Sequence, residues 1–228
     1  MKPKIIDSYE ALPLGTYLDI MAACKAEMDE TDRQIRIVSL LSGLDEDELL
    51  RMPIADFRSL SVKAKFLEDE IPEQKRPLTK TIRLGDLTVE VTTKVTKITT
   101  AQYIDCQTFI QDPARLVELL ACFLIPKGCE YNEGYDIDEV YQAIRDHLMV
   151  TEAHALSAFF FRRYQTLIGA SLLYSVLMAK GIRDKTKRRE MTTKAKAAWT
   201  AFRRSGDGSQ TWTRLLIPPA SRGLQYGE

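Results

Sequence analysis

Through most of the first 70 residues, apolar side chains recur every three or four positions, a spacing that predicts amphipathic helices. Capping and stop signals divide this stretch into four helices. Asp32 is expected to cap the second helix and Gly43 to end it, while Asp45 and Glu48 have the spacing of a capping box for the third. Pro53 suits the first turn of the fourth. The predicted apolar stripes consist of Tyr17, Ile20, Met21, Cys24, Met28, Ile37, Leu40, Leu41, Leu44, Phe57, Leu60, Ala64 and Leu67.

The period changes from 3.6 to 2 after a linker at 71–80 that contains two prolines. In the segment 80–97, two runs rich in Thr, Ile, Leu and Val flank Gly85-Asp86, a pattern typical of a β-hairpin. Because an isolated hairpin is marginal in water, it must lie on the helices, add strands from elsewhere in the chain, or pair with another subunit. We expect an open edge of this hairpin to be a docking surface.

Helical spacing resumes at 101–111. Asp112 and Pro113 predict the start of another helix over 114–125, and Pro126 and Gly128 predict its end. A further helix is expected from Asp136 to about Met149. The strongest apolar signal follows at 152–181. Only its 16 residues from Tyr164 to Ala179 lack charge, fewer than the roughly 20 needed to cross a hydrocarbon core, so we expect a buried central helix and no membrane span.

These elements predict a mainly α fold, a helical bundle with an inserted β-hairpin and an extended C-terminal arm. We divide the chain into an N-terminal helical unit (1–72), a linker and hairpin (73–100), a C-terminal helical domain with the long central helix (101–182), and a basic helix with the arm (183–228). A disordered tail usually lacks large apolar residues, so we expect the arm to dock on the core or on a neighbouring subunit. Its candidate protein-binding residues are Trp212, Leu215, Leu216 and Ile217.

Charge is balanced over the whole chain, with 32 basic and 32 acidic residues, so no net field favours nucleic acid. Locally, residues 183–204 hold nine basic and two acidic residues, whereas residues 27–73 hold thirteen acidic and six basic ones. Attraction between these segments, within or between chains, is one role for the basic segment, and a solvated helix is another. Nucleic-acid binding through Lys185, Lys187, Arg188 and Arg189 stays open but is not favoured.

Candidate chemistry is sparse. The four cysteines form no CxxC pair, and the N-terminus has no apolar stretch typical of a signal peptide, which favours free thiols in a reducing cytoplasm. His147 and His154 lack metal-ligand spacing, and the acidic loop 130–139 lacks the pattern of a calcium loop. No phosphate-loop, dinucleotide or hydrolase string occurs. We therefore expect no catalytic residue, no metal and no cofactor.

The sequence from Ser42-Gly43-Leu44 through the acidic start 45–48 to Pro53, Asp56 and Phe57 resembles that of bacteriophage tail assembly chaperones. The resemblance covers roughly residues 15–70. It implies a non-catalytic helical protein of the infected host's cytoplasm that binds the tape-measure or other tail proteins and prevents their premature aggregation. The candidate protein-binding residues of this unit are Leu49, Leu50, Phe57 and Leu60.

The hairpin, the long apolar helix and the arm exceed what such a chaperone needs. A structural virion subunit, in the neck, the tail or the interior, that polymerises through the hairpin edge and the arm is therefore a second hypothesis. Both hypotheses predict a homo-oligomer or a larger assembly. A nucleic-acid-binding protein that uses the basic segment is the third.

Overall fold

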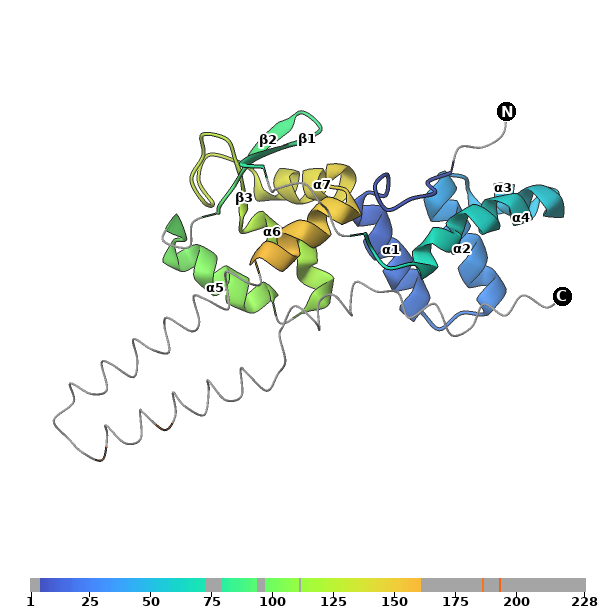
Figure 1. Ribbon diagram of the computed structural model, residues 1–228, viewed down its shortest axis with the longest axis horizontal. Coiled ribbons are helices and arrows are strands. Elements are labelled where there is room, and N and C mark those ends of the chain that lie inside the picture. The colour runs from blue at the N-terminus through green and yellow to red at the C-terminus, as the bar shows by residue number, and fades with distance from the viewer. Residues whose placement is uncertain are drawn as a thin grey trace.

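The computed structural model describes residues 5–72, 79–93, 97–110 and 112–160, together with Thr186 and Thr193. Within this part the protein is mainly helical with one small antiparallel sheet, as the sequence predicted. Helices α1–α4 form one end of the molecule, and the sheet with α5 lies at the other (Figure 1). The part of the predicted apolar helix after residue 160, the basic segment and the arm lie outside the described residues, apart from the two threonines.

The N-terminal helices follow the local signals closely. They are α1 (Leu14–Lys25), α2 (Glu30–Ser42), α3 (Glu46–Leu50) and α4 (Ile54–Lys63), followed by the 3-10 turn η1 (Ala64–Glu68). Gly43 ends α2 in the left-handed conformation, and the capping box of Asp45 and Glu48 is present on α3. The expected cap at Asp32 is wrong. Asp29 caps α2 instead, because its Oδ1 accepts hydrogen bonds from the backbone N–H groups of Thr31 (2.8 Å) and Asp32 (3.0 Å).

The hairpin consists of β1 (Thr81–Leu84) and β2 (Leu87–Val91), and the chain supplies a third strand, β3 (Leu124–Pro126), on the far side of β2. Val91 pairs with Leu124, and Val89 pairs with Pro126. The predicted helix over 114–125 is consequently shorter than expected. A 3-10 turn, η3 (Pro113–Arg115), leads into α6 (Leu116–Ala121), and the apolar residues that follow enter the sheet, where Leu124 is fully buried. Strand β3 thus pairs with the β2 edge of the hairpin.

A continuous apolar core joins the two ends of the molecule, from Ile5 to Phe160. It also includes residues of α5 (Thr100–Phe109), α7 (Ile137–His147) and the helical residues 150–160. Helix α1 packs against both α2 and α7. The backbone of the segment before α1 pairs with the segment after α7: the Leu14 N–H donates to the Leu148 carbonyl at 2.8 Å, and the Val150 N–H donates to the Leu12 carbonyl at 2.9 Å. The apolar core therefore includes residues from both sides of residue 72.

In the part of the chain that the structure describes, no helix combines the length and the apolar character that crossing a membrane requires.

Tyr9 ties the N-terminal segment to the end of η1 and makes the fold sensitive to high pH. Its side chain is 3% exposed, and its hydroxyl donates to the backbone carbonyls of Leu67 and Asp69, each at 3.1 Å. Burial, with a smaller contribution from the Asp69 carboxylate, raises the pKa of Tyr9 from 10.0 to about 12. A raised pKa means that the folded state holds this proton more tightly than the unfolded chain does.

We therefore expect the stabilisation by Tyr9 to be complete below pH 10 and to be lost as the pH rises through about 12. Tyr9→Phe lacks this titrating group and its two hydrogen bonds, so it should melt below the wild type at neutral pH. The difference in melting temperature should then shrink as the pH is raised from about 9 to about 11.5. A constant difference over this range, measured by thermal unfolding, would contradict the assignment.

Candidate functional site

The outer face of α3 and α4 exposes three large apolar side chains within thirteen positions of the sequence. Leu50 is 65% exposed, Ile54 67% and Val62 61%. The only other exposed large hydrophobic in the described residues is Ile104 on α5. Single exposed apolar residues are normal on protein surfaces, but several of them on two adjacent short helices point to an interaction site.

The local sequence explains why these side chains face outward. Helix α4 turns Leu60 and Ser61 toward the core, and the Ser61 hydroxyl donates to the Phe57 carbonyl at 3.0 Å. Ile54 and Val62 lie eight residues apart, about 12 Å along the helix, and both are exposed. The exposed, positively charged Arg58 lies about one turn from each of them along the helix.

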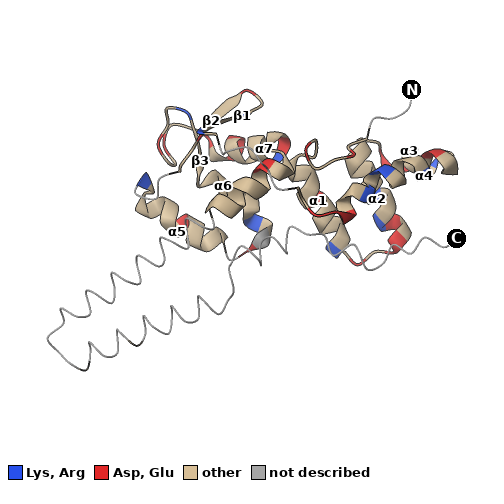
Figure 2. Ribbon diagram, in the orientation of Figure 1, with Lys and Arg blue, Asp and Glu red and all other residues tan. Residues whose placement is uncertain are grey.

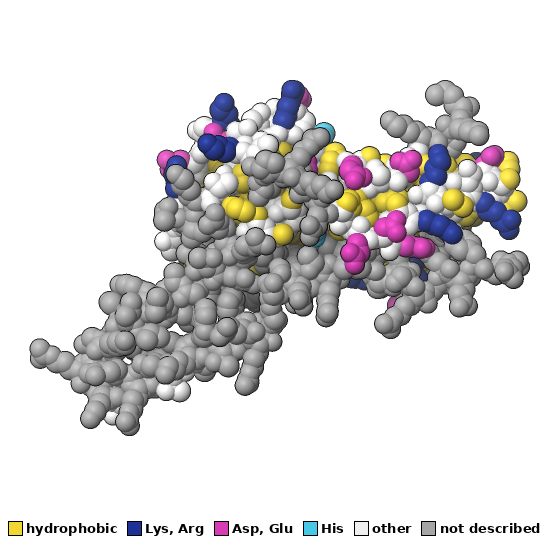
Figure 3. Space-filling view, viewed as in Figure 1, with side chains coloured by type: hydrophobic (Ala, Val, Ile, Leu, Met, Phe, Trp, Pro, Cys, Tyr) yellow, Lys and Arg dark blue, Asp and Glu magenta, His cyan; other side chains and the backbone are white. Residues whose placement is uncertain are grey.

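Charged residues of both signs lie beside these apolar side chains, and the exposed cations are Arg51, Arg58 and Lys63. The first turn of α3 contains Glu46, Asp47 and Glu48, and the first turn of α4 contains Asp56. Figure 2 shows both acidic and basic segments along α2, α3 and α4, and Figure 3 shows hydrophobic side chains between charged ones at the same end of the molecule. We call the set formed by Leu50, Ile54, Val62, Asp47 and Asp56 the α3–α4 surface.

The structure separates the predicted protein-binding residues of this unit into two groups. Leu49 and Leu60 are 3% and 4% exposed and belong to the core, and Phe57 is half-buried against it. Leu50 alone among the four is exposed. The predicted residues of the arm (Trp212, Leu215, Leu216 and Ile217) and of the basic segment (Lys185, Lys187, Arg188 and Arg189) lie outside the described residues.

Ile54 and Val62 were missed by the sequence reasoning. The available signal was their position off the stripe formed by Phe57, Leu60, Ala64 and Leu67. An apolar residue outside the core stripe of an otherwise amphipathic helix has no partner within its own fold, and it therefore points to an external contact.

A second candidate site is the cluster of buried thiols between α5 and α6. The Tyr131 hydroxyl donates to Asp105 Oδ2 at 2.7 Å and lies 3.6 Å from the Cys122 sulfur. The hydrogen bond to Cys122 and burial raise the pKa of Cys106, and burial together with the bond to Asp105 raises the pKa of Tyr131. Both groups are therefore held protonated, whereas a nucleophilic cysteine requires a lowered pKa. The cluster is therefore suited to filling the core between α5 and α6 and not to nucleophilic chemistry.

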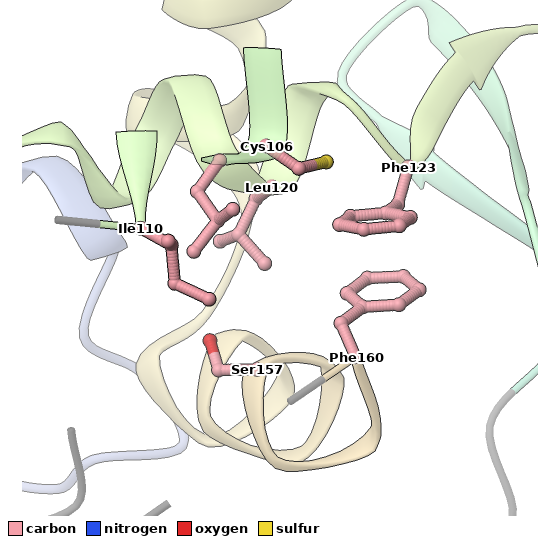
Figure 4. Close-up of a pocket in the computed structure, with 7 residues that line it drawn as sticks. Cys106, Ile110, Leu120, Phe123, Ser157 and Phe160 are labelled. Atoms are coloured by element: carbon pink, nitrogen blue, oxygen red, sulfur yellow. The ribbon is translucent and has the colours of Figure 1, made fainter. Parts of the chain in front are cut away.

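Beside these thiols lies a cavity of about 10 Å³, room for about one water-sized sphere. The rings of Phe123 and Phe160 stack across one side of it, with centroids 4.0 Å apart. The Ser157 hydroxyl in its wall donates to the Ala153 carbonyl at 2.7 Å. Figure 4 shows the lining residues Cys106, Ile110, Leu120, Phe123, Ser157 and Phe160. This volume is far below that of a small-molecule site.

The histidines and cysteines of the described residues do not converge on a metal site. No group of three or more His, Cys, Asp or Glu side chains suited to a metal ion occurs there. The His147 ring packs against the hairpin turn at Gly85. All four cysteines are free thiols, as expected, with Cys106 and Cys122 buried and the other two half-buried.

Comparison with known proteins adds no relative: no family model, curated protein or solved structure matches the chain. The functional conclusion therefore depends on the chain's own residues.

Proposed function

We propose that this protein is a non-catalytic assembly factor that binds another protein through the α3–α4 surface. The observation that carries the proposal is the exposure of Leu50, Ile54 and Val62, each above 60%, on adjacent short helices. Burying such side chains contributes about 1.5–3 kcal/mol each, which makes this the surface with the most to gain from a partner among the described residues.

The resemblance of residues 15–70 to tail assembly chaperones suggests the class of partner. It favours a phage tail or virion protein, such as a tape-measure, tail or neck protein, in the host cytoplasm. The capping box of Asp45 and Glu48 supports this role, because it fixes the start of the short helix that carries the exposed Leu50.

The proposal is tested by affinity purification from cells that naturally express the chain, with quantitative mass spectrometry of what is retained. The double variant Leu50→Gln/Ile54→Gln removes the apolar side chains while keeping good helix formers. The matched control is Ile104→Gln, which changes a 56% exposed apolar residue on α5. We expect a specific partner to be retained by the wild type and the control, and to fall about tenfold in the double variant.

Equal recovery of every partner by the wild type and the double variant would contradict the proposal.

Mass spectrometry of purified particles separates the two phage hypotheses. An assembly chaperone is absent from mature particles, whereas a structural subunit is present at a fixed copy number.

A further inference from the structure

Strand β1 forms an open edge of the sheet. The strand order is β1-β2-β3, so within the described residues β1 has a neighbour on one side only. The Val91 N–H donates to the Lys80 carbonyl at 2.8 Å, and hydrogen-bonded and non-hydrogen-bonded pairs alternate along an antiparallel ladder, so the backbone groups of Ile82 also face β2. The N–H and C=O groups of Thr81 and Arg83 therefore point away from β2, and no described residue is bonded to them on that side.

The opposite edge of the sheet, on β3, is closed. The Lys127 N–H donates to the Thr88 carbonyl at 2.9 Å, so by the same alternation the backbone groups of Leu124 and Pro126 are the outward ones. Both residues are buried, and proline has no N–H to donate. A further strand can therefore be added at β1 and not at β3.

The side chains of β1 divide between the two faces of the sheet. Thr81 and Arg83 are exposed on the outer face, which they share with the exposed Glu90 opposite Thr81 on β2. Ile82 and Leu84 lie on the core face. Leu84 is 1% exposed, whereas Ile82 is only half-buried. The core is thus incompletely covered along this edge.

The two charged residues of this outer face are unpaired. Neither Arg83 nor Glu90 forms an ion pair within the described residues. The Arg83 Nε donates to the Gly85 carbonyl at 3.0 Å, which leaves its two Nη groups for another acceptor. A charged side chain on an edge strand usually prevents strand pairing, but it does so where it meets a like charge.

We propose that β1 pairs antiparallel with β1 of a second copy of this chain, around a two-fold axis at Ile82. In this register Thr81 exchanges backbone hydrogen bonds with Arg83 of the second copy, and Ile82 lies opposite its own equivalent. That central pair is of the non-hydrogen-bonded type, in which facing side chains lie closest, so each Ile82 covers the other. The pairing does not depend on the proposed function. It leaves both α3–α4 surfaces free, because the sheet and helices α3 and α4 lie at opposite ends of the molecule (Figure 1).

Charge complementarity favours a second copy in this register. Arg83 of the second copy lies beside Thr81, and Glu90 lies one strand further along the same row. Since neighbouring strands are about 4.8 Å apart, the Cα atoms of this Arg–Glu pair lie about 10 Å apart, a distance that the two extended side chains span across the small threonine. The two-fold axis repeats the contact. An axis at Arg83 would instead place the two arginines opposite each other, which is destabilising.

The pairing ends at two copies, because the β3 edge is closed and the contact uses the same strand of each copy. Strand β1 has four residues, so the interface is small and the dimer is expected to dissociate in the range of about 10–100 µM. Sedimentation velocity of the purified full chain from about 1 to about 300 µM should therefore show a monomer that converts to a dimer and to nothing larger.

The backbone pairing is tested at Thr81. Thr81→Pro removes an outward N–H at the first residue of an edge strand, a position where proline is tolerated, so the hairpin should still form. This variant should be monomeric over the whole concentration range. Thr81→Val is the matched control, because it keeps the N–H and the β-branched side chain, and it should dimerise as the wild type does. Thermal unfolding checks that both variants are folded.

The register is tested by reversing charges. Arg83→Glu and Glu90→Arg should each raise the dimer dissociation constant about tenfold, because each creates a like-charge contact between the copies. The double variant Arg83→Glu/Glu90→Arg restores the opposite charges and should return the dissociation constant to within about threefold of the wild type. Lys127→Glu, a reversal at an exposed residue beside β3, should have no effect.

These charge variants decide the matter if Thr81→Pro fails to fold. A chain that stays monomeric up to about 300 µM would overturn the inference. So would a dimer that is unchanged by both Thr81→Pro and Arg83→Glu, or one that the double charge reversal fails to restore. Species that grow beyond the dimer with concentration would also contradict it, since they require a second edge or surface.

Discussion

Replacing Leu49 by Ala should lower the free energy of unfolding by about 2–4 kcal/mol, whereas the same change at the adjacent Leu50 should alter it by less than about 0.5 kcal/mol. Leu49 is 3% exposed within the core, so its truncation leaves a cavity, while Leu50 is 65% exposed and loses only solvated surface. Both residues lie in α3, and Ala is an excellent helix former, so helix propensity does not separate the two variants.

Chemical denaturation of the two variants measures this contrast, and partner capture gives the complementary readout. Leu50→Ala should reduce partner binding while the fold stays intact. Leu49→Ala should reduce binding only in proportion to the unfolded fraction, so lowering the temperature should restore it. If the two substitutions destabilised the protein equally, the inward and outward faces of α3 would be assigned wrongly.

The local signals of the N-terminal unit were readable from the sequence because short-range hydrogen bonds determine them. The capping box of Asp45 and the left-handed Gly43 need only a few neighbouring residues. The sequence predicts Asp32 as the cap of α2, three residues after the observed cap, Asp29. Both residues offer a carboxylate near the start of the same helix. Only the observed backbone path shows which one lies outside the first turn.

Tertiary contacts determined the features that the sequence did not show. Leu124 belongs to a short apolar run that fits either a buried helix or a buried strand, and its pairing with Val91, far away in sequence, decides for the strand. The outward direction of Ile54 and Val62 similarly depends on where the core lies relative to α4. The hairpin and the helical class, which follow from the period of the pattern, were predicted correctly.

The hairpin turn provides the second large effect. Leu84 pairs with Leu87 across a two-residue loop in which Gly85 has φ +60°. A glycine with positive φ at the first central position is typical of a type II′ turn. A Cβ at this position would lie 2.6 Å from His147 Nε2 at the end of α7. Gly85→Ala therefore adds backbone strain and displaces the exposed His147 ring, and we expect it to cost about 1–3 kcal/mol of stability, most of it strain.

Gly43→Ala is the matched control, because Gly43 also has a positive φ (+68°) but no atom within 4 Å of the added Cβ. It should cost only about 1 kcal/mol, the strain alone. Adding His147→Ala to Gly85→Ala should recover the steric part, which appears as a coupling energy in a double-mutant cycle measured by denaturant unfolding. Strict additivity of the two substitutions would mean that the His147 ring moves aside at no cost.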